Sequence, residues 1–580
     1  MKKLLVLLAA LSLVAVAEDS KLSSDLKGKD GNARVEVIVQ FKTPPGQSQK
    51  EKLGNHGGQV KKTFNSVKSV LASMPAGKLA ALAADPDVRY ISPNRPLRSY
   101  LDNTTAAVGA PVAWNFGLDG SGVGVAVVDS GVTNRPDFDN VVNGGSRLVY
   151  NENFVAGSST TADQFGHGTH VAGIIAGNGK QSSGASYFRT FRGLAPAARI
   201  VNLKVLDDNG KGTDADVIEA IQQAIALKDI YNIRVLNLSL GRPIRESYVL
   251  DPLCQAAEAA YRAGIVVVAS AGNRGRDNSF GNNGYGTIMA PGNDPFVITV
   301  GAMRSMFTPD RSDDLIASYS SKGPSLVDHV VKPDLVAPGN MVVSLKGTGS
   351  IINTYPENVV PKSYYIADGS TEAISGQYFF LNGTSMAAPA VSGAIALMLQ
   401  REPTLTPDQV KARLMRTAYK TFPLYSSTFD AKTGVTYHHQ YDIFTIGAGY
   451  LDIAAALADA EPAAGTAASP TAAYDATCNC VYLVANSSAV WGSSTVWGGS
   501  AVWGSNLFLS DQSAVWGGSA VWGSSAVWGS SAVWGSSAVW GSSTTSGFSA
   551  VWGSSAVWGS SAVWGSSNIE ALSVVVFGEE

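Results

Sequence analysis

Two kinds of segment alternate along residues 105–458. Some are short and apolar on both faces, like strands inside a sheet, and they lie at 123–129, 199–206, 234–240, 264–270 and 296–302. Others have the helical period, and in residues 214–227 one face carries Val217, Ile218, Ile221, Ala224 and Ile225. Buried strands separated by amphipathic helices are typical of a parallel sheet covered on both sides. The pattern therefore predicts a three-layer α/β domain with a mainly parallel sheet.

Residues 33–98 follow a different pattern, which predicts a small α+β unit of the ferredoxin-like kind. The expected elements are a strand at 35–41, a hairpin at 59–74, a short helix at 76–86 and a final strand at 88–94. Pro86 ends the helix because proline lacks the N–H that a helix needs. The polar stretch 95–107 is expected to be a linker.

The composition changes beyond residue 458. Residues 459–486 include an Ala/Pro/Ser stretch and are expected to be a linker, and residues 568–580 to form a last strand. Between them, 487–567 repeat a hexad resembling S-A-V-W-G-S, with tryptophan at 491, 497, 503, 516, 522, 528, 534, 540, 552, 558 and 564. Because six is even, a strand keeps valine on one face and tryptophan on the other, which favours a β-solenoid. The Ser/Gly-rich background leaves low-complexity disorder as the alternative.

Composition and the N-terminus narrow the function classes. A chain of 580 residues is too long for one core, and its net charge of −3 offers no basic stripe for nucleic acid. Residues 1–17 combine two lysines, an apolar run and an Ala-Val-Ala cleavage signal, which predicts a secretory signal peptide. No other apolar run is long enough to span a membrane, so an exported, soluble protein is expected. Three cysteines are too few for a disulfide framework.

The stretch QFGHGTH, residues 164–170, holds two of the six histidines. A zinc-protease helix sets its histidines four apart with a glutamate between them, and His167 and His170 have neither feature. The other chemistry is a general base for a nucleophile. That base needs a carboxylate to orient it and a hydroxyl to deprotonate.

The chain supplies both groups at the ends of apolar elements. Asp129 follows a buried strand, Ser385 begins an apolar helix after a Gly-Thr step, and Asn273 follows another buried strand. Each residue alone also fits an ordinary role: a turn or cap for Asp129, an N-cap for Ser385, a turn for Asn273.

Taken together with their surroundings, these residues resemble the subtilisin-like serine proteases, or subtilases. The resemblance covers roughly residues 110–455 and includes the motifs GHGTHVAGIIAG, GLAPAARI, KPDLVAPG and NGTSMAAPAVSGA. It implies that Ser385 is the nucleophile, that His167 is its base and that Asp129 orients the base. It also implies that Asn273 and the backbone N–H of Ser385 bind the oxyanion, while His170 packs structurally.

The resemblance further implies where a substrate lies. Its backbone would pair with Ser239, Leu240 and Gly241 on one side and with the segment around Gly210 and Gly212 on the other. Arg274 would then stand at the rim of the pocket for the residue before the cut (P1), where its charge would favour acidic residues. An arginine that only reaches solvent is the simpler alternative.

The resemblance requires no cofactor, and calcium stays open as an additional ligand. Asp137 matches a calcium-ligand position of some subtilases, but the loop 177–193, which supplies their remaining ligands, has no carboxylate here. The N-terminal unit resembles an inhibitor-type propeptide. It would act as an intramolecular inhibitor until self-cleavage between about Pro96 and Thr105.

Two functions follow from these observations. The first is a secreted, extracellular serine endopeptidase that is made as a self-processing precursor and acts on proteins and peptides. A variant of this hypothesis adds that the tryptophan repeats hold the active protease at a surface. The alternative is a surface-binding, adhesive repeat protein with an inactive protease scaffold. Casein cleavage separates them. Residues 345–380 form a long insertion near Ser385, for which the sequence suggests only a loop beside the cleft.

Overall fold

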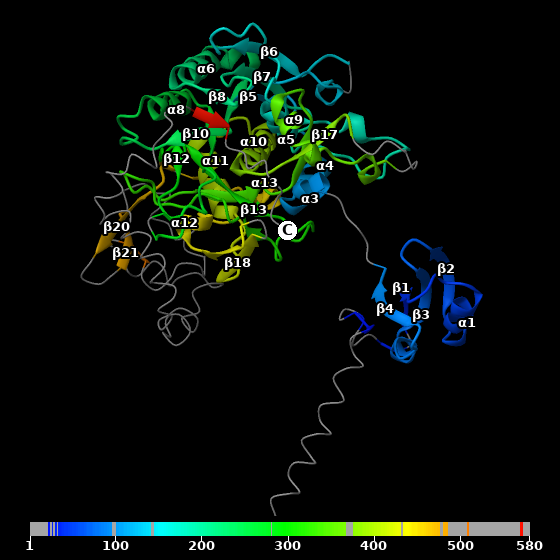
Figure 1. The fold of residues 1–580 in the computed structure, drawn as a ribbon. Coiled ribbons are helices and arrows are strands. Elements are labelled where there is room, and N and C mark those ends of the chain that lie inside the picture. Colours follow the sequence, from blue (N-terminus) through cyan, green and yellow to red (C-terminus); the bar gives the residue numbers. More distant parts are fainter. Residues whose placement is uncertain are drawn as a thin grey trace, which may run out of the picture. The chain divides into compact units, whose positions relative to one another are not determined.

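The computed structural model (Figure 1) describes residues 21–23, 26, 30–31, 33–94, 100–140, 144–279, 281–366, 375–430, 433–463, 465–475 and 480–484, and the backbone of 507–509 and 569–571. The expected signal peptide and nearly all of the tryptophan repeat lie outside these residues. The chain divides into two units, Met1–Leu97 and Arg98–Glu580. Within the described part, no helix is both long and apolar enough to span a membrane.

The first unit is an antiparallel sheet with two helices. Its elements are β1 (Arg34–Phe41), α1 (Gln47–Asn55), β2 (Gln59–Phe64), β3 (Ser69–Pro75), α2 (Leu79–Ala83) and β4 (Val88–Pro93), with the strand order β2-β3-β1-β4. Every second residue of β1 points inward, so Val37, Val39 and Phe41 are buried against Leu53 and Leu82 of the helices. The strands and α2 agree with the elements expected from the sequence, whereas α1 was not expected from the residue pattern.

The second unit is built on a central sheet in the order β14-β13-β11-β9-β5-β7-β6, with β15 also beside β13. All neighbours are parallel except β13 and β14. The strands are β5 (Gly124–Asp129), β6 (Leu148–Asn153), β7 (Arg199–Lys204), β9 (Ile233–Leu238), β11 (Val266–Ser270), β13 (Ile298–Arg304), β14 (Leu315–Ile316) and β15 (Leu335–Pro338). The predicted α/β domain with a mainly parallel sheet is confirmed.

Helices cover both faces of this sheet. Val125 and Val127 of β5 face a core formed with α5 (His167–Ala176) and α10 (Thr384–Arg401), while Ala126 and Val128 face α6 (Asp214–Ala226) and α8 (Pro252–Arg262). Both sets are fully buried, which explains why the strand sequence is apolar without alternation.

The three central strands bring the predicted chemistry to one edge. β11, β9 and β5 are neighbours, and they end at Ser270, Leu238 and Asp129. Because parallel strands end at the same edge, Asp129 lies near the segments that contain Ser239 and Asn273.

The remaining elements are short. They are α4 (Ala110–Asn115), β8 (Lys211–Gly212), α7 (Lys228–Tyr231), β10 (Leu240–Pro243), β12 (Met289–Ala290), β16 (Val342–Leu345), α9 (Ser350–Thr354), β17 (Tyr378–Leu381), α11 (Pro407–Thr417), β18 (Tyr425–Asp430), β19 (Val435–Gln440), α12 (Ile443–Ile446), α13 (Ile453–Ala458) and β22 (Leu507–Leu509).

Two segments expected to be linkers contain regular structure. Helix α3 (Tyr100–Ala107) occupies most of the first, and an antiparallel pair, β20 (Thr471–Asp475) and β21 (Cys480–Val484), lies in the second. Ala472 and Val481 are buried against Phe444 in a small core. Tertiary burial thus overrides the low apolar content of these stretches.

A strand from the far end of the chain joins the second unit. Strand β23 (Ile569–Ala571), red in Figure 1, lies between β10 and β8 in a sheet of order β12-β10-β23-β8. It is antiparallel to both neighbours. The expected strand at 568–580 therefore exists over these three residues, and its neighbours are β8 and β10.

Candidate active site

A carboxylate and an imidazole meet at the end of β5. Asp129 and His167 are fully buried, and Asp129 Oδ1 lies 2.7 Å from His167 Nδ1. The same oxygen accepts a hydrogen bond of 2.7 Å from the backbone N–H of Ser130. This arrangement favours the tautomer with the proton on Nδ1, which leaves a lone pair on Nε2. Among the described residues, Nε2 has no hydrogen-bond partner.

A second buried carboxylate, which the sequence analysis missed, positions the histidine helix. Asp163 accepts backbone N–H bonds from Gly166 (2.6 Å), the N-cap residue of α5, and from Thr169 (2.8 Å) in its first turn. Ser130 Oγ donates to Asp163 (2.8 Å) and accepts from the N–H of Gly168 (2.9 Å). Burial raises the pKa of Asp163. Strand β5 and helix α5 are therefore joined by one polar network.

Gly168 permits the close approach that this network needs. A Cβ there would lie 2.2 Å from the carbonyl oxygen of Gly131 and 3.1 Å from Asp129 Oδ1. Any side chain would push the helix away from the carboxylate, so glycine is required next to His167.

Ser385 lies fully buried in the first turn of α10, where backbone N–H groups lack partners within the helix. Its Oγ donates to the carbonyl oxygen of Ser239 (3.0 Å), and Ser239 Oγ donates to the carbonyl oxygen of Ser385 (2.9 Å). Asn237 donates to Ser239 Oγ (2.9 Å) and accepts from Ser392 Oγ (2.8 Å). The start of the helix is thus held against the ends of β9 and β10.

The side chain of Asn273 is held with its amide group free to donate. Its Oδ1 accepts from the backbone N–H of Thr384 (3.0 Å) and from Thr384 Oγ1 (3.1 Å). Both bonds fix the oxygen, so Nδ2 points the other way, and it has no partner within the described part of the chain. A buried, unpaired donor next to Ser385 can stabilise an oxyanion.

His170 has a different environment from His167. Its Nε2 is 3.1 Å from the carbonyl oxygen of Val342 and 3.0 Å from that of Phe379. Burial lowers the pKa of His170 to about 3, so the ring stays neutral at ordinary pH. The structure gives His170 a packing role between α5 and the β16–β17 hairpin.

The surroundings of Asp137 do not fit a calcium ion. The carboxylate accepts hydrogen bonds from the backbone N–H of Gln181 (3.2 Å) and from Tyr378 OH (3.4 Å), and burial raises its pKa to about 6. The nearby guanidinium of Arg147 donates to the carbonyl oxygens of Asp137 (2.6 Å) and Ala176 (2.7 Å). Calcium needs several oxygen ligands, whereas this site presents donors. The described residues include no cluster of three metal-ligating side chains.

The residues predicted to hold a substrate backbone lie on two short strands. Gly212 belongs to β8, with Gly210 just before it, while Leu240 and Gly241 belong to β10, with Ser239 just before them. Both strands pair with β23, so the structure brings the predicted residues to opposite sides of one slot. Arg274 is half-buried beyond Asn273, and its backbone N–H donates to Ser321 Oγ (3.1 Å).

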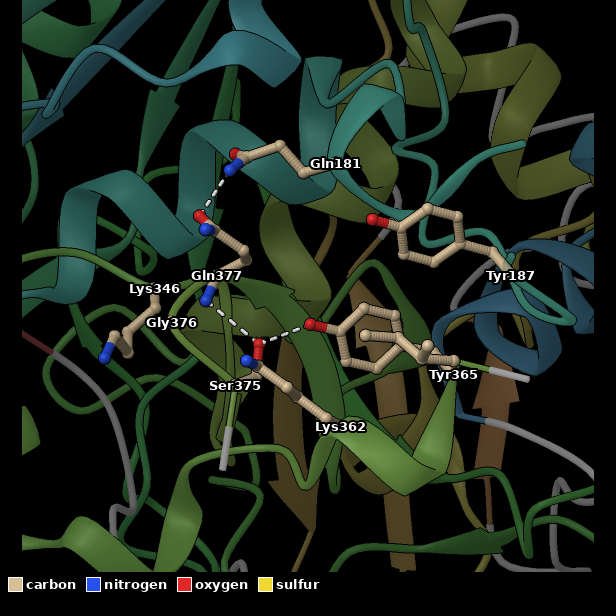
Figure 2. Close-up of a pocket in the computed structure, with 9 residues that line it drawn as sticks. Gln181, Tyr187, Lys346, Lys362, Tyr365, Ser375, Gly376 and Gln377 are labelled. Atoms are coloured by element: carbon tan, nitrogen blue, oxygen red, sulfur yellow. Dashed lines mark hydrogen bonds between the residues drawn. The ribbon is translucent and has the colours of Figure 1, made fainter. Parts of the chain in front are cut away.

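The long insertion supports the histidine loop. The backbone N–H groups of Ser350 and Ile351, at the start of α9, donate to the carbonyl oxygens of Gln164 and Phe165 (both 3.0 Å). Nearby, Tyr187 and Tyr365 stack at 5.9 Å between ring centroids. Figure 2 shows the polar pocket that these tyrosines line, where Ser375 Oγ bonds to Tyr365 OH (2.7 Å). None of the predicted site residues lines this pocket.

Comparison with known proteins gives concordant matches for both units. The sequence matches the subtilase family over residues 120–447 and the fervidolysin N-terminal prodomain over residues 26–94. It is 36% identical to serine protease AprX of Bacillus subtilis (strain 168) over 374 residues, which cover 63% of this chain and 76% of that protein. It is 33% identical to subtilisin E of the same strain over 419 residues, covering 71% of this chain and 92% of that protein.

A third relative is an alkaline protease of Shouchella clausii. The two sequences are 33% identical over 358 residues, which cover 61% of this chain and 75% of the relative. All three matches are thus with proteins named as proteases or subtilisins.

Proposed function

The chain belongs to the subtilase family of serine peptidases and has a fervidolysin-type prodomain, and we propose that it is a secreted, self-processing endopeptidase that uses Asp129, His167 and Ser385. The observation that carries this proposal is the buried Asp129–His167 pair, whose 2.7 Å contact leaves the lone pair of Nε2 available at the edge of the sheet where Ser385 Oγ bonds to Ser239.

The proposed reaction proceeds through an acyl-enzyme. Ser385 Oγ attacks the peptide carbonyl carbon while His167 Nε2 takes the hydroxyl proton, and Asp129 stabilises the imidazolium that forms. His167 then gives this proton to the leaving amine as the C–N bond breaks. A water molecule repeats both steps on the ester, and the carboxylic acid product leaves Ser385 protonated again.

The oxyanion of each tetrahedral intermediate would be held by Asn273 Nδ2 and the backbone N–H of Ser385. Thr384 supports this assignment because its two bonds to Asn273 Oδ1 fix the amide before the reaction begins. Such preorganised donors stabilise the transition state without reorganisation.

Arg274 is proposed to favour acidic P1 residues through its charge at the pocket rim. The test is Arg274→Glu with paired peptide substrates that have glutamate or lysine at P1. The ratio of kcat/KM values should move severalfold toward lysine; an unchanged ratio would leave Arg274 as a solvent-exposed arginine.

The N-terminal sequence and the prodomain support the remaining parts of the proposal. The predicted signal peptide implies export to the extracellular space, where the tryptophan repeats are proposed to provide surface attachment. The prodomain is proposed to inhibit the peptidase until it is cut away between about Pro96 and Thr105.

The test combines casein hydrolysis with covalent labelling by a fluorophosphonate. Wild type and the matched surface variant Ser312→Ala should cleave casein and carry the label on the tryptic peptide that contains Ser385. The Ser385→Ala variant should do neither. Casein cleavage that persists in Ser385→Ala would refute the proposed nucleophile.

A further inference from the structure

We propose that the C-terminal strand β23 is a substrate-like inhibitor that occupies the substrate groove of the same chain. The inference rests on the proposed function, because the groove is the place where that function needs a peptide to bind. Its own evidence is the pairing of Ile569–Ala571 with both β8 and β10, between which it lies in one sheet.

The slot between β8 and β10 accepts one extended strand. Glu570 lies opposite Gly241 of β10 and also opposite Lys211 of β8, while Ile569 lies opposite Gly212. A strand inserted between two edges satisfies backbone groups on both sides, which is how peptides are bound by strand addition. Any substrate that pairs with the same edges must therefore displace β23.

The direction and register of β23 are those of the acyl side of a substrate. β10 begins directly after Ser239, whose carbonyl oxygen accepts the 3.0 Å bond from Ser385 Oγ. Because β23 is antiparallel to β10, its carboxyl end points toward this bond, and Ala571 is already opposite Leu240. A peptide must run this way to bring the carbonyl group of its P1 residue to the nucleophile.

Covalent attachment makes so short a strand effective. Three paired residues bind weakly as a free peptide, but a tethered segment acts at an effective concentration of about 1 mM. With a dissociation constant of about 0.1 mM for the free segment, roughly nine tenths of the grooves would be filled. The apparent affinity for substrate would fall about tenfold. A cut just beyond Ala571 would leave the tethered strand in place as a product inhibitor.

The test compares full-length, N-terminally processed protein with two variants at residue 570. Glu570→Pro removes a ladder hydrogen bond from a strand that is paired on both sides, whereas Glu570→Gln keeps the backbone and removes only the charge. A chain that ends after residue 567 lacks β23 and serves as a second form in which no tethered strand fills the groove. The kcat/KM for a short peptide p-nitroanilide is measured for each, and intact mass establishes beforehand that residues 569–571 are still attached.

The proposal predicts a kcat/KM about tenfold higher for Glu570→Pro and for the shortened chain, and an unchanged value for Glu570→Gln. The synthetic segment NIEALS, added to the shortened chain, should inhibit it competitively. Equal kcat/KM values in all forms would overturn the inference, as would an equal rise in Glu570→Gln.

Fluorophosphonate labelling separates this inference from the proposed function. The reagent reacts at Ser385 without needing the β8–β10 slot to hold a peptide. If every form is labelled and hydrolyses the peptide equally, only the proposal that β23 inhibits the peptidase is overturned. Absence of both labelling and hydrolysis in every form would overturn the proposed function, and with it the inference that depends on it.

Discussion

The proposed catalytic centre and the proposed substrate groove satisfy their polar groups in different ways. At the centre, buried side chains from β5, α5 and α10 are fixed by partners within the core, such as Asp163 for the start of α5 and Thr384 for Asn273. In the groove, Lys211–Gly212 and Leu240–Pro243 present strand edges, which a strand from far along the chain completes.

This difference indicates that the groups proposed for the reaction and the groups proposed to bind the substrate backbone lie in separate parts of the unit. Among the described residues, the unpaired atoms at the centre include His167 Nε2 and Asn273 Nδ2, which the proposed reaction uses, together with Asp129 Oδ2, the second oxygen of the carboxylate that orients His167. The proposed groove would bind a substrate by backbone pairing, which any extended peptide can supply. Changes at the centre should therefore reduce kcat strongly, and changes in the groove should raise KM moderately.

The largest effect is expected from Asp129→Asn. An asparagine amide would donate to His167 Nδ1 and place the ring proton on Nε2, so that His167 could no longer accept the proton of Ser385. The expected loss in kcat is about 10⁴-fold, with KM nearly unchanged. Steady-state kinetics beside the exposed variant Asp229→Asn, which should match wild type, would measure it; a loss below tenfold would contradict the assigned role.

A smaller loss is expected from Asn273→Ala, because one of two proposed oxyanion donors disappears. The value known for subtilisin is about 10²–10³-fold in kcat. Thr384→Val, which keeps the shape but removes one anchor of the Asn273 amide, should cost about tenfold or less, the equivalent of one hydrogen bond. If Thr384→Val cost as much as Asn273→Ala, the proposed division between donor and anchor would be wrong.

Gly212→Ala should affect the groove alone. Its Cβ would lie 2.2 Å from the carbonyl oxygen of Val205, so β8 must shift and lose backbone pairing with a bound peptide. In the chain that ends after residue 567, where β23 does not compete, one or two weakened hydrogen bonds correspond to a rise in KM of about tenfold, with kcat retained. Gly376→Ala is the matched control, since a Cβ there meets no atom within 4 Å. A fall in kcat instead would show that groove and centre are coupled.

Much of the fold was predictable because its signals are local. The buried strands of the central sheet and the amphipathic face of residues 214–227 follow directly from residue periodicity. The β20–β21 pair was not predictable in this way, since Ala472 and Val481 are buried in a core built by Phe444 and other distant residues. Helix α3 was missed because its stretch is largely polar.

The residues of the candidate site likewise fall into those with a local sequence signal and those without one. Asp129, His167, Asn273 and Ser385 lie in sequence motifs, and the structure brings them to one edge of the sheet. Asp163 lies three residues before Gly166, the N-cap of α5, so no capping signal in the sequence marks it. The pairing of β23 carries no such signal, because three residues near 570 reveal nothing about edges near 212 and 240 until the fold exists.

The most direct test of the central claim is mass spectrometry of purified wild type and Ser385→Ala after refolding. If Asp129, His167 and Ser385 form a working peptidase centre, wild type will lose its N-terminal unit by a cut between about residues 96 and 105, and Ser385→Ala will stay intact. Trimming of pure Ser385→Ala at the same place would contradict the claim, as would a wild type that neither trims itself nor cleaves casein.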